Sequence, residues 1–254
     1  MKTTIFCVAH KAPAVRLPAG IKTLGVGQYD AADYFTGNGD HINHKNPRYS
    51  EVSAIYWLLN NTCPEFDESD MIGLCHYRRF FEGLQRANAK HAAPGQAQLS
   101  VQDFNAQAAA FSPLDFVPHF SKGEWLIPNP VDLGRSTLQF YSEKHLGAAH
   151  DIELAYEAAT ERGLWNPEFS ELQLYKNTQL VPYCMSILPR EQFKAIWTKI
   201  LSTLLAIEPQ VTNPQDPYQK RNMGFLAERL HSSALFYAER NGACLQRARV
   251  VQVG

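Results

Sequence analysis

Hydrophobic residues occur in short continuous runs in the first part of the chain and in helical stripes in the last part. Residues 3–9 form an apolar, β-branched run that stops at His10 and Lys11, a pattern typical of a buried strand. Residues 21–28 form a similar run with glycines at its exit, and residues 71–75 indicate a further strand. We therefore expect His10 and Lys11 at the carboxyl end of the first strand of a sheet.

The clearest helix start in the chain is at Asn46 and Pro47. Asparagine suits the N-cap, and proline suits the first helical position because its fixed φ is already helical. The apolar residues that follow recur at helical spacing: Val52, Ile55, Tyr56 and Leu59. We predict a helix over residues 47–60 that packs beside a central strand at 71–75.

The later part of the chain alternates predicted strands with longer helices. Strands are expected at 124–134 and 180–189, and an amphipathic helix follows the second of these. Residues 82–101 are rich in Ala, Gln and Gly and predict a mobile loop. This order favours an α/β fold, with a mostly parallel central sheet and helices on both faces, in a single domain over residues 1–254.

Composition and charge limit the classes of function. The chain has 254 residues and 45% hydrophobic content, enough for a full core. Its 24 Lys and Arg nearly balance its 25 Asp and Glu, so no nucleic-acid partner is expected and any anion site must be local. The 5 cysteines are scattered without CxxC spacing, as in a reduced cytoplasmic protein. No apolar run approaches the roughly 20 residues of a membrane span, so membrane contact is expected to be peripheral at most.

Candidate chemistry follows the strand at 71–75. His76, Tyr77, Arg78 and Arg79 come directly after it, and ligands of open α/β sheets bind beyond the carboxyl ends of the strands. Two guanidinium groups and an imidazole can bind a diphosphate through charge-assisted hydrogen bonds. In the structural alternative, both arginines pair with surface carboxylates while Tyr77 packs inward. Spacing alone does not decide between the two.

Two stretches, residues 40–61 and 71–81, carry a distinctive set of polar and aromatic residues. The positions concerned are Asn43, Lys45, Asn46, Tyr49, Glu51, Tyr56, Trp57, Gly73, Leu74, His76, Tyr77, Arg78 and Arg79. Together they resemble the signature of a bacterial glycosyltransferase family that was first described as a domain of unknown function and is encoded among capsular-polysaccharide and O-antigen genes.

The resemblance extends over nearly the whole chain. Gln139, Tyr141 and His145 are similar to a later stretch of the family, and residues 221–230 are similar to its closing Gly-Phe-Leu-x-Glu-Arg-Leu. The chain departs from the family at Cys184, where an asparagine is more common.

The resemblance implies a GT-A-like nucleotide-diphospho-sugar transferase fold. It also implies transfer of a sugar, such as a galactose-type hexose, from a UDP-linked nucleotide-sugar donor to a growing cell-surface polysaccharide or lipid-linked glycan. The expected location is the cytoplasm, or the inner face of the bacterial membrane.

The leaving diphosphate of such a reaction needs a cationic partner, commonly a metal ion held by Asp-x-Asp. This chain has no Asp-x-Asp, and its nearest relative, Glu68-Ser69-Asp70, precedes the strand rather than following it. We therefore assign the cationic role to His76, Arg78 and Arg79. No obligatory cofactor is predicted, although a divalent metal, Mn²⁺ or Mg²⁺, remains open.

The expected catalytic residues are thus His76, Arg78 and Arg79, with Glu228 as an acceptor-side base. The alternative for Glu228 is an intrahelical pair with Arg229. Glu51 is expected either to interact with the helix dipole or to orient one of the arginines. The residues expected to bind substrate or nucleotide are His10, Lys11, Asp40, Asn43, Lys45, Asn46, Tyr49, Glu51, Tyr77, His145 and Arg229.

Two other classes of function stay open. A non-catalytic nucleotide- or sugar-binding module would keep the arginines and lose the acceptor-side carboxylate. A metal-dependent hydrolase would use Asp40, His41 and His44, but no spaced carboxylate or thiol completes that set, so no metal site is predicted there.

Overall fold

The computed structural model describes residues 1–18, 20–82, 97–106, 123–145 and 148–254. The strands of its 10-stranded main sheet are β1 (Thr3–Ala9), β2 (Ile21–Gly25), β3 (Tyr34–Phe35), β4 (Met71–His76), β5 (Arg79–Phe81), β6 (Ala97–Leu99), β7 (Glu124–Pro128), β10 (Ile187–Pro189), β11 (Cys244–Ala248) and β12 (Val250–Val253). A small second sheet pairs β8 (Val131–Asp132) with β9 (Gln179–Leu180).

The central strands of the main sheet run parallel. The order across the sheet is β11-β7-β10-β4-β1-β2-β3, and β1 pairs in parallel with both β2 and β4. β10 runs antiparallel to β4 and β7. The registers align Val8 with Leu24 and with His76, so three neighbouring strands end at the same edge. The predicted fold class, an α/β fold with a mainly parallel central sheet, is confirmed.

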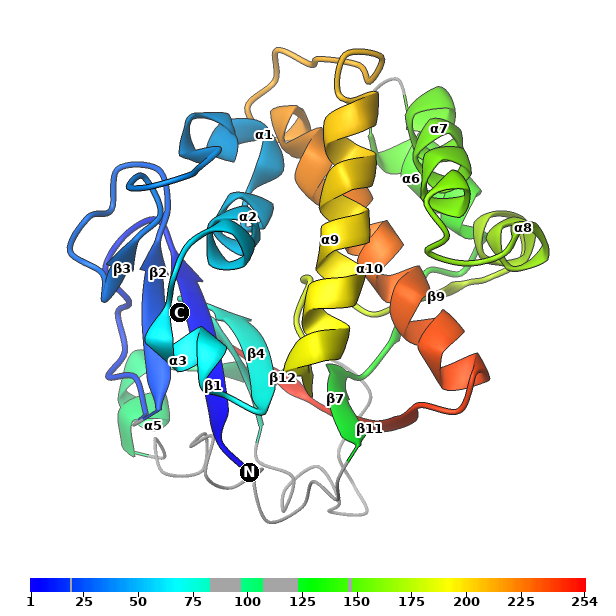
Figure 1. Ribbon diagram of the computed structural model, residues 1–254. Coiled ribbons are helices and arrows are strands. Elements are labelled where there is room, and N and C mark those ends of the chain that lie inside the picture. The colour runs from blue at the N-terminus through cyan, green and yellow to red at the C-terminus, as the bar shows by residue number, and fades with distance from the viewer. Residues whose placement is uncertain (19, 83–96, 107–122, 146–147) are drawn as a thin grey trace.

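The helices are α1 (Asn46–Tyr49), α2 (Val52–Asn60), α3 (Pro64–Asp67), α5 (Val101–Ala106), α6 (Thr137–Lys144), α7 (Ala148–Glu161), α8 (Pro167–Tyr175), α9 (Arg190–Ile207) and α10 (Asn222–Arg240). The long helices α9 and α10 pack side by side in front of the sheet, and α6, α7 and α8 pack together beyond them (Figure 1).

The residues of β1 show how the two faces of the sheet are covered. Phe6 and Val8 lie in the larger core, together with side chains of α2, α9 and α10. Ile5 and Cys7 point to the opposite face and belong to a smaller core with Phe104 of α5 and side chains of β5 and β12. Helices lie on both faces, as predicted, but unequally, because the second face is covered by the short α5 and by strands.

The helix predicted over residues 47–60 is two helices in the structure. α1 ends at Tyr49, and α2 begins at Val52 after Ser50 adopts a positive φ of 50°. The Asn46 side chain supports the break, because its Nδ2 donates a hydrogen bond to the Ser50 carbonyl at 2.8 Å. The single helix was a wrong prediction, since hydrophobic periodicity does not reveal this side-chain contact.

The predicted burial and the position beside a central strand are confirmed, but the N-cap of α1 is Lys45 and not Asn46. Val52 and Ile55 are fully buried, and β4 lies in the middle of the sheet between β1 and β10. The break itself makes a distant contact, because Arg221 Nε donates to Ser50 Oγ at 2.9 Å. Ser50 therefore joins the α1–α2 segment to the start of α10.

The strand predicted over residues 180–189 is also divided. β9 ends at Leu180 and β10 begins at Ile187. Between them, Tyr183 and Cys184 have positive φ values of 73° and 54°. Non-glycine residues rarely adopt this left-handed conformation, so the turn costs free energy that other contacts must offset.

The bounds predicted for the loop at residues 82–101 were wrong at both ends. Glu82 is buried and pairs with Arg249, and Ala97–Leu99 form β6, which pairs with β12. These contacts come from β12 and from Arg249 directly before it, a region where no strand was predicted. Residues 83–96 lie outside the described residues.

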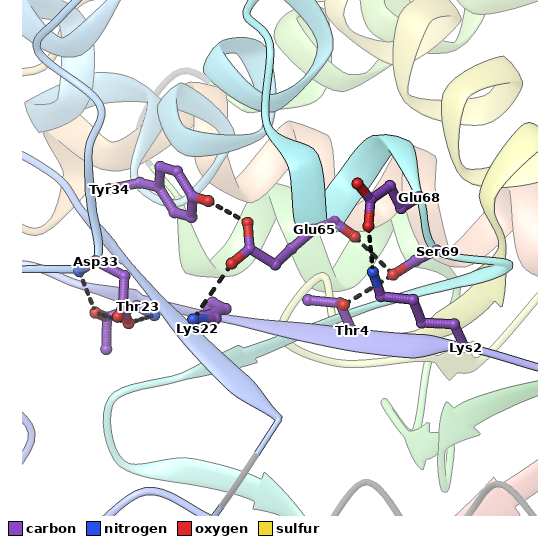
Figure 2. Close-up of polar contacts among 9 residues, drawn as sticks. All are labelled: Lys2, Thr4, Lys22, Thr23, Asp33, Tyr34, Glu65, Glu68 and Ser69. Atoms are coloured by element: carbon purple, nitrogen blue, oxygen red, sulfur yellow. Dashed lines mark hydrogen bonds and ion pairs between the residues drawn. The ribbon is translucent and has the colours of Figure 1, made fainter.

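Polar contacts join the first strands to the segment before β4 (Figure 2). The hydroxyl groups of Thr4 and Ser69 share a buried hydrogen bond of 2.8 Å. The Tyr34 hydroxyl donates to Glu65, whose carboxylate also lies 3.3 Å from Lys22 Nζ. These contacts connect β1, β2 and β3 to α3 and to Ser69, which follows it. They stabilise the part of the sheet that these three strands form.

Acidification should destabilise the fold through His231 of α10. This side chain is fully buried and stacks on Trp197 with 4.8 Å between ring centroids, and burial lowers its pKa to about 3. As the pH falls below the ordinary histidine pKa of about 6.5, the unfolded chain takes up a proton that the folded chain excludes. Stability present above that pH should therefore be lost at roughly 1.4 kcal/mol per pH unit as the pH falls toward the folded pKa.

Urea unfolding between pH 7 and pH 4 measures this slope. His231→Gln should make the slope shallower by roughly 1.4 kcal/mol per pH unit, whereas the matched change His150→Gln, at an exposed histidine, should leave it unchanged. An equal slope in wild type and His231→Gln would contradict the assignment.

Candidate functional site

A cavity of about 930 Å³ lies at the carboxyl ends of β1, β2 and β4. β1 has β2 on one side and β4 on the other, so this edge is a topological switch point, where the connections diverge and leave a crevice. Residues that follow all three strands line it, among them His10, Val26 and Tyr77. The cavity is therefore where an α/β sheet is expected to bind a ligand.

The segment from His76 to Arg79 is a tight hairpin between β4 and β5. His76 and Arg79 are paired, which leaves Tyr77 and Arg78 as the turn. Arg78 is exposed at the tip, with its guanidinium carbon 5.4 Å from the Tyr77 ring centroid, and Arg79 is half-buried on the returning strand. All four side chains line the cavity, so the structure brings these predicted residues together.

Positive charge is concentrated around the cavity. Two lining residues are carboxylates, Glu51 and Glu228, against six basic ones, although the whole chain has a net charge of −1. The basic residues are Arg78, Arg79, Lys144, Lys220, Arg221 and Arg229. Among the described residues, Arg229 is the one member of this group that forms an ion pair, with Glu228. The arrangement suits an anionic ligand, which can supply the missing countercharge.

His10 lies where several of these charges converge. Burial lowers its pKa below the usual range, and the positive charges of Lys11, Arg78 and Arg221 lower it further. Its ring also contacts the edge of Tyr77, with 4.7 Å between centroids. Because these cations come from the ends of β1 and β4 and from the start of α10, a bound anion would relieve repulsion among three separate parts of the chain.

The strained turn at Tyr183 and Cys184 is held by two predicted site residues. Glu228 Oε1 accepts a hydrogen bond from the Tyr183 N–H at 2.6 Å. His76 Nε2 lies 2.7 Å from the Tyr183 carbonyl oxygen, which can only accept, so His76 carries a proton on Nε2. Both backbone polar groups of Tyr183 are thus satisfied, and His76 and Glu228 position this turn.

The turn in its strained form places a ring against Arg79. The guanidinium carbon of Arg79 lies 4.5 Å from the Tyr183 ring centroid, in cation–π geometry. The next residue, Cys184, is buried, and burial followed by the Glu51 and Glu228 charges raises the pKa of its thiol. Asparagine adopts left-handed backbone more readily than cysteine, which is a physical reason for an asparagine at this position.

Glu51 lies at the N-cap of α2 and lines the cavity. Its side chain does not cap the helix, and none of the ion pairs among the described residues includes it. Its carboxylate acts on His76, where burial lowers the pKa and the Glu51 charge opposes that shift. Among the described residues, Glu51 forms no ion pair with Arg78 or Arg79. Its charge acts instead on the pKa values of His76 and Cys184.

His145 and Arg229 belong to the wall that α6 and α10 form. The His145 ring stacks on Phe225 at 4.3 Å, and its Nδ1 lies 3.3 Å from Gln219 Oε1. Burial, with a smaller contribution from Arg229, lowers the pKa of His145 to about 4, so its imidazole is neutral near pH 7. Arg229 is 5% exposed, and its guanidinium carbon lies 5.4 Å from the Tyr141 ring centroid.

Asn46 and Glu51 line the cavity, but Asn43, Lys45 and Tyr49 do not. Lys45 Nζ pairs with Glu208 at 2.6 Å, and the Tyr49 hydroxyl donates to the same carboxylate at 3.0 Å. The Asn43 side chain makes two hydrogen bonds to the Gly27 backbone. Its Oδ1 accepts from the Gly27 N–H at 2.7 Å, and its Nδ2 donates to the Gly27 carbonyl oxygen at 2.8 Å. These three side chains hold the segment in place behind the site.

Lys11 and Asp40 are likewise outside the lining. Lys11 is exposed, with its Nζ 5.7 Å from the Tyr77 ring centroid. Asp40 is exposed and accepts a hydrogen bond from the Tyr56 hydroxyl at 3.0 Å. Lys11 can act on the cavity only through its charge at His10, and Asp40 supports the loop.

Several lining residues were not predicted, chief among them Tyr183, Lys220 and Arg221. A signal existed for the two basic residues, because they form a basic pair directly before the last long helix. No such signal marks Tyr183, since a left-handed backbone at a non-glycine residue leaves no trace in composition or periodicity.

His41 and His44 are the histidines of the 40–44 loop that a metal-dependent hydrolase would use. The rings of His41 and His44 lie 6.2 Å apart. In the ranges given above, no group of three or more His, Cys, Asp or Glu side chains could hold a metal ion. The donor set of this loop therefore does not fit a divalent metal.

Comparison with solved structures relates the chain to a known fold. It is similar to WbbM, a bifunctional glycosyltransferase solved in its apo form, with a TM-score of 0.85 and 20% identity. The similarity covers 100% of this chain and 46% of that one, so the chain spans just under half the length of WbbM. At this level of identity the likeness shows a shared fold. No curated protein matches the sequence.

The sequence also matches a family model, described as a domain of unknown function, DUF4422, over residues 4–239. The matched region includes His10, the His76–Arg79 hairpin and Glu228, and it covers most of the chain. The chain therefore belongs to the DUF4422 family.

Proposed function

We propose that the protein is a glycosyltransferase that moves a hexose of galactose type from a UDP-linked donor to a growing cell-surface polysaccharide or lipid-linked glycan. The observation that carries the proposal is a group of basic side chains at the switch point of the sheet that form no ion pair within the described part of the chain: Arg78, Arg79, Lys144, Lys220 and Arg221. The fold shared with WbbM agrees with it. Arg78 and Arg79 bind the diphosphate, and fixed guanidinium charge stabilises it as it leaves.

In the proposed reaction, an acceptor hydroxyl oxygen forms a bond to the anomeric carbon of the sugar. The bond from that carbon to the diphosphate oxygen breaks, and the nucleoside diphosphate leaves with the electron pair. The hydroxyl proton passes to a carboxylate. Glu228 is poorly placed to take it, because one carboxylate oxygen accepts from Tyr183 and the other contacts Arg229. Glu51 is the other carboxylate of the cavity, and we assign the proton to it.

The location of the activity is part of the proposal. In the described portion of the chain, no helix combines the length and the apolar character that crossing a bilayer requires. We place the reaction in the cytoplasm or at the inner face of the membrane, where nucleotide-sugars and lipid-linked glycans meet.

A screen of nucleotide-sugars by release of free nucleotide, together with calorimetric titration of UDP, tests the function. A transferase binds UDP and releases it from at least one donor sugar. Binding without turnover would instead favour a non-catalytic module. Activity that depends on added metal and does not change with UDP would favour a hydrolase.

Removing either arginine should weaken nucleotide binding. Arg78→Ala and Arg79→Ala should each cost about 1.5–3 kcal/mol of UDP binding, the scale of a hydrogen bond to a charged group. Arg→Lys should restore only part of this, because an ammonium lacks the planar fork of guanidinium. The matched control is Arg190→Ala, at the start of α9 and beside the amino end of β4, which should bind UDP normally. Wild-type affinity in a folded double mutant would exclude the role.

Glu51→Gln should reduce the rate of transfer by about 10²–10⁴-fold with little change in UDP affinity, because general base catalysis contributes on that scale. The exposed Glu191→Gln serves as the control. Steady-state kinetics with calorimetry separates the two effects. A Glu51→Gln enzyme with wild-type turnover would show that another group takes the proton.

Turnover should not strictly require a divalent metal. Guanidinium groups stay charged at any working pH, so they can neutralise the leaving diphosphate without one. The assay is donor-sugar transfer after exhaustive chelation, followed by addition of Mn²⁺ or Mg²⁺. Most activity should survive chelation, and complete loss with full recovery on Mn²⁺ would assign the cationic role to a metal instead.

A further inference from the structure

Part of the cavity lining is apolar and aromatic. It includes Val131 of β8, Phe140 of α6, Phe225 of α10, and Tyr218 from the segment that precedes α10. Five large hydrophobic side chains are exposed in the described part of the chain, and two of them, Val131 at 36% and Tyr218 at 58%, belong to this wall. Exposed apolar surface gathered in a cavity marks a binding surface more often than a structural one.

Tyr218 is exposed, yet its backbone is fixed from both sides. Asp216 Oδ1 accepts hydrogen bonds from the N–H groups of Tyr218 at 3.0 Å and Gln219 at 2.8 Å. Gln219 Nε2 in turn donates to the Lys144 carbonyl at 3.0 Å, which ties the segment to the end of α6. A ring presented to solvent on such a rigid support loses little further entropy when a ligand stacks on it.

The rings behind Tyr218 continue the wall inward. The Tyr218 and Phe225 centroids lie 5.1 Å apart, and Phe225 stacks on His145 at 4.3 Å with an interplanar angle of 25°. His145 is neutral near pH 7 because burial lowers its pKa to about 4. This wall therefore offers aromatic faces and a neutral imidazole, with the Arg221 guanidinium carbon 5.7 Å from the Phe225 centroid.

We propose that Tyr218 and Phe225 form the acceptor subsite and that its occupant is a sugar ring of a saccharide acceptor. One face of a pyranose is made of C–H groups and packs on aromatic rings, while its hydroxyl groups point outward to polar partners. Lys144 and Lys220 lie along the same cavity and can supply such partners. A diphosphate on the arginine wall and an acceptor on the aromatic wall leave the transferred sugar between them. This inference rests on the proposed function.

Sugar transfer to a panel of soluble saccharides tests whether this wall is the acceptor subsite. The probes are the methyl glycosides of galactose, glucose, mannose and rhamnose, added to the protein with a donor that it cleaves. At least one should accelerate nucleotide release above slow hydrolysis. Tyr218→Ala should raise the KM for that saccharide about tenfold, on the scale of one lost aromatic contact. Donor KM and acceptor-free hydrolysis should not change, because the arginine wall is intact.

Two matched variants sharpen the result. Tyr218→Trp keeps an aromatic face and should retain the acceptor KM of wild type. Tyr175→Ala removes a tyrosine of similar exposure, 47%, on α8 outside the cavity lining, and should also behave as wild type.

Equal acceptor KM in wild type and Tyr218→Ala would overturn the inference. So would donor hydrolysis that no saccharide accelerates, including the case in which a polyprenyl diphosphate alone does so. A wild-type protein that neither binds UDP nor cleaves any nucleotide-sugar would remove the proposed function itself, and the acceptor subsite with it.

Discussion

The parallel pairing of β1 with both β2 and β4 is the constraint on which the site depends. The register brings three strand ends to one edge, and each end delivers a different group to the cavity. A shift of one residue in a strand would reverse which side chains face the two cores. The buried side chains of β1 oppose such a shift, because Phe6 and Val8 pack with the long helices while Ile5 and Cys7 pack on the other face.

The second requirement of the site is a strained turn that neighbouring elements stabilise. Tyr183 would gain nothing from its left-handed backbone in isolation. Hydrogen bonds from β4 and α10 meet at its peptide groups, and its ring then faces Arg79. Two residues that motif similarity alone would call catalytic, His76 and Glu228, thus have an observed structural task. This is why we assign proton transfer to Glu51.

Much of the fold could be predicted from local patterns, and the site only in part. The apolar run at 71–75 and the stripe through Val52 and Ile55 are patterns of residues close in sequence. The central strand and the buried helix face that they predicted are confirmed. Ser50 and Tyr183 have backbone conformations that depend on side-chain contacts, with Asn46 for one and with the distant Glu228 for the other. No periodicity reports such contacts. For the same reason Lys45 and Tyr49 looked like ligand-binding residues, although their partner is Glu208, far along the chain.

The contact between Ser50 and Arg221 joins residues 171 positions apart. Gly224 allows it, because a Cβ there would lie 3.0 Å from Ser50 Oγ and 3.4 Å from the Tyr49 carbonyl oxygen. A contact of such long sequence separation forms only when the intervening chain is closed into a loop, which costs entropy. The cavity is consequently a property of the fully folded chain and not of either half. Any ligand that fills it binds the native state alone, so it stabilises the whole protein by an amount that grows with the ligand concentration relative to Kd.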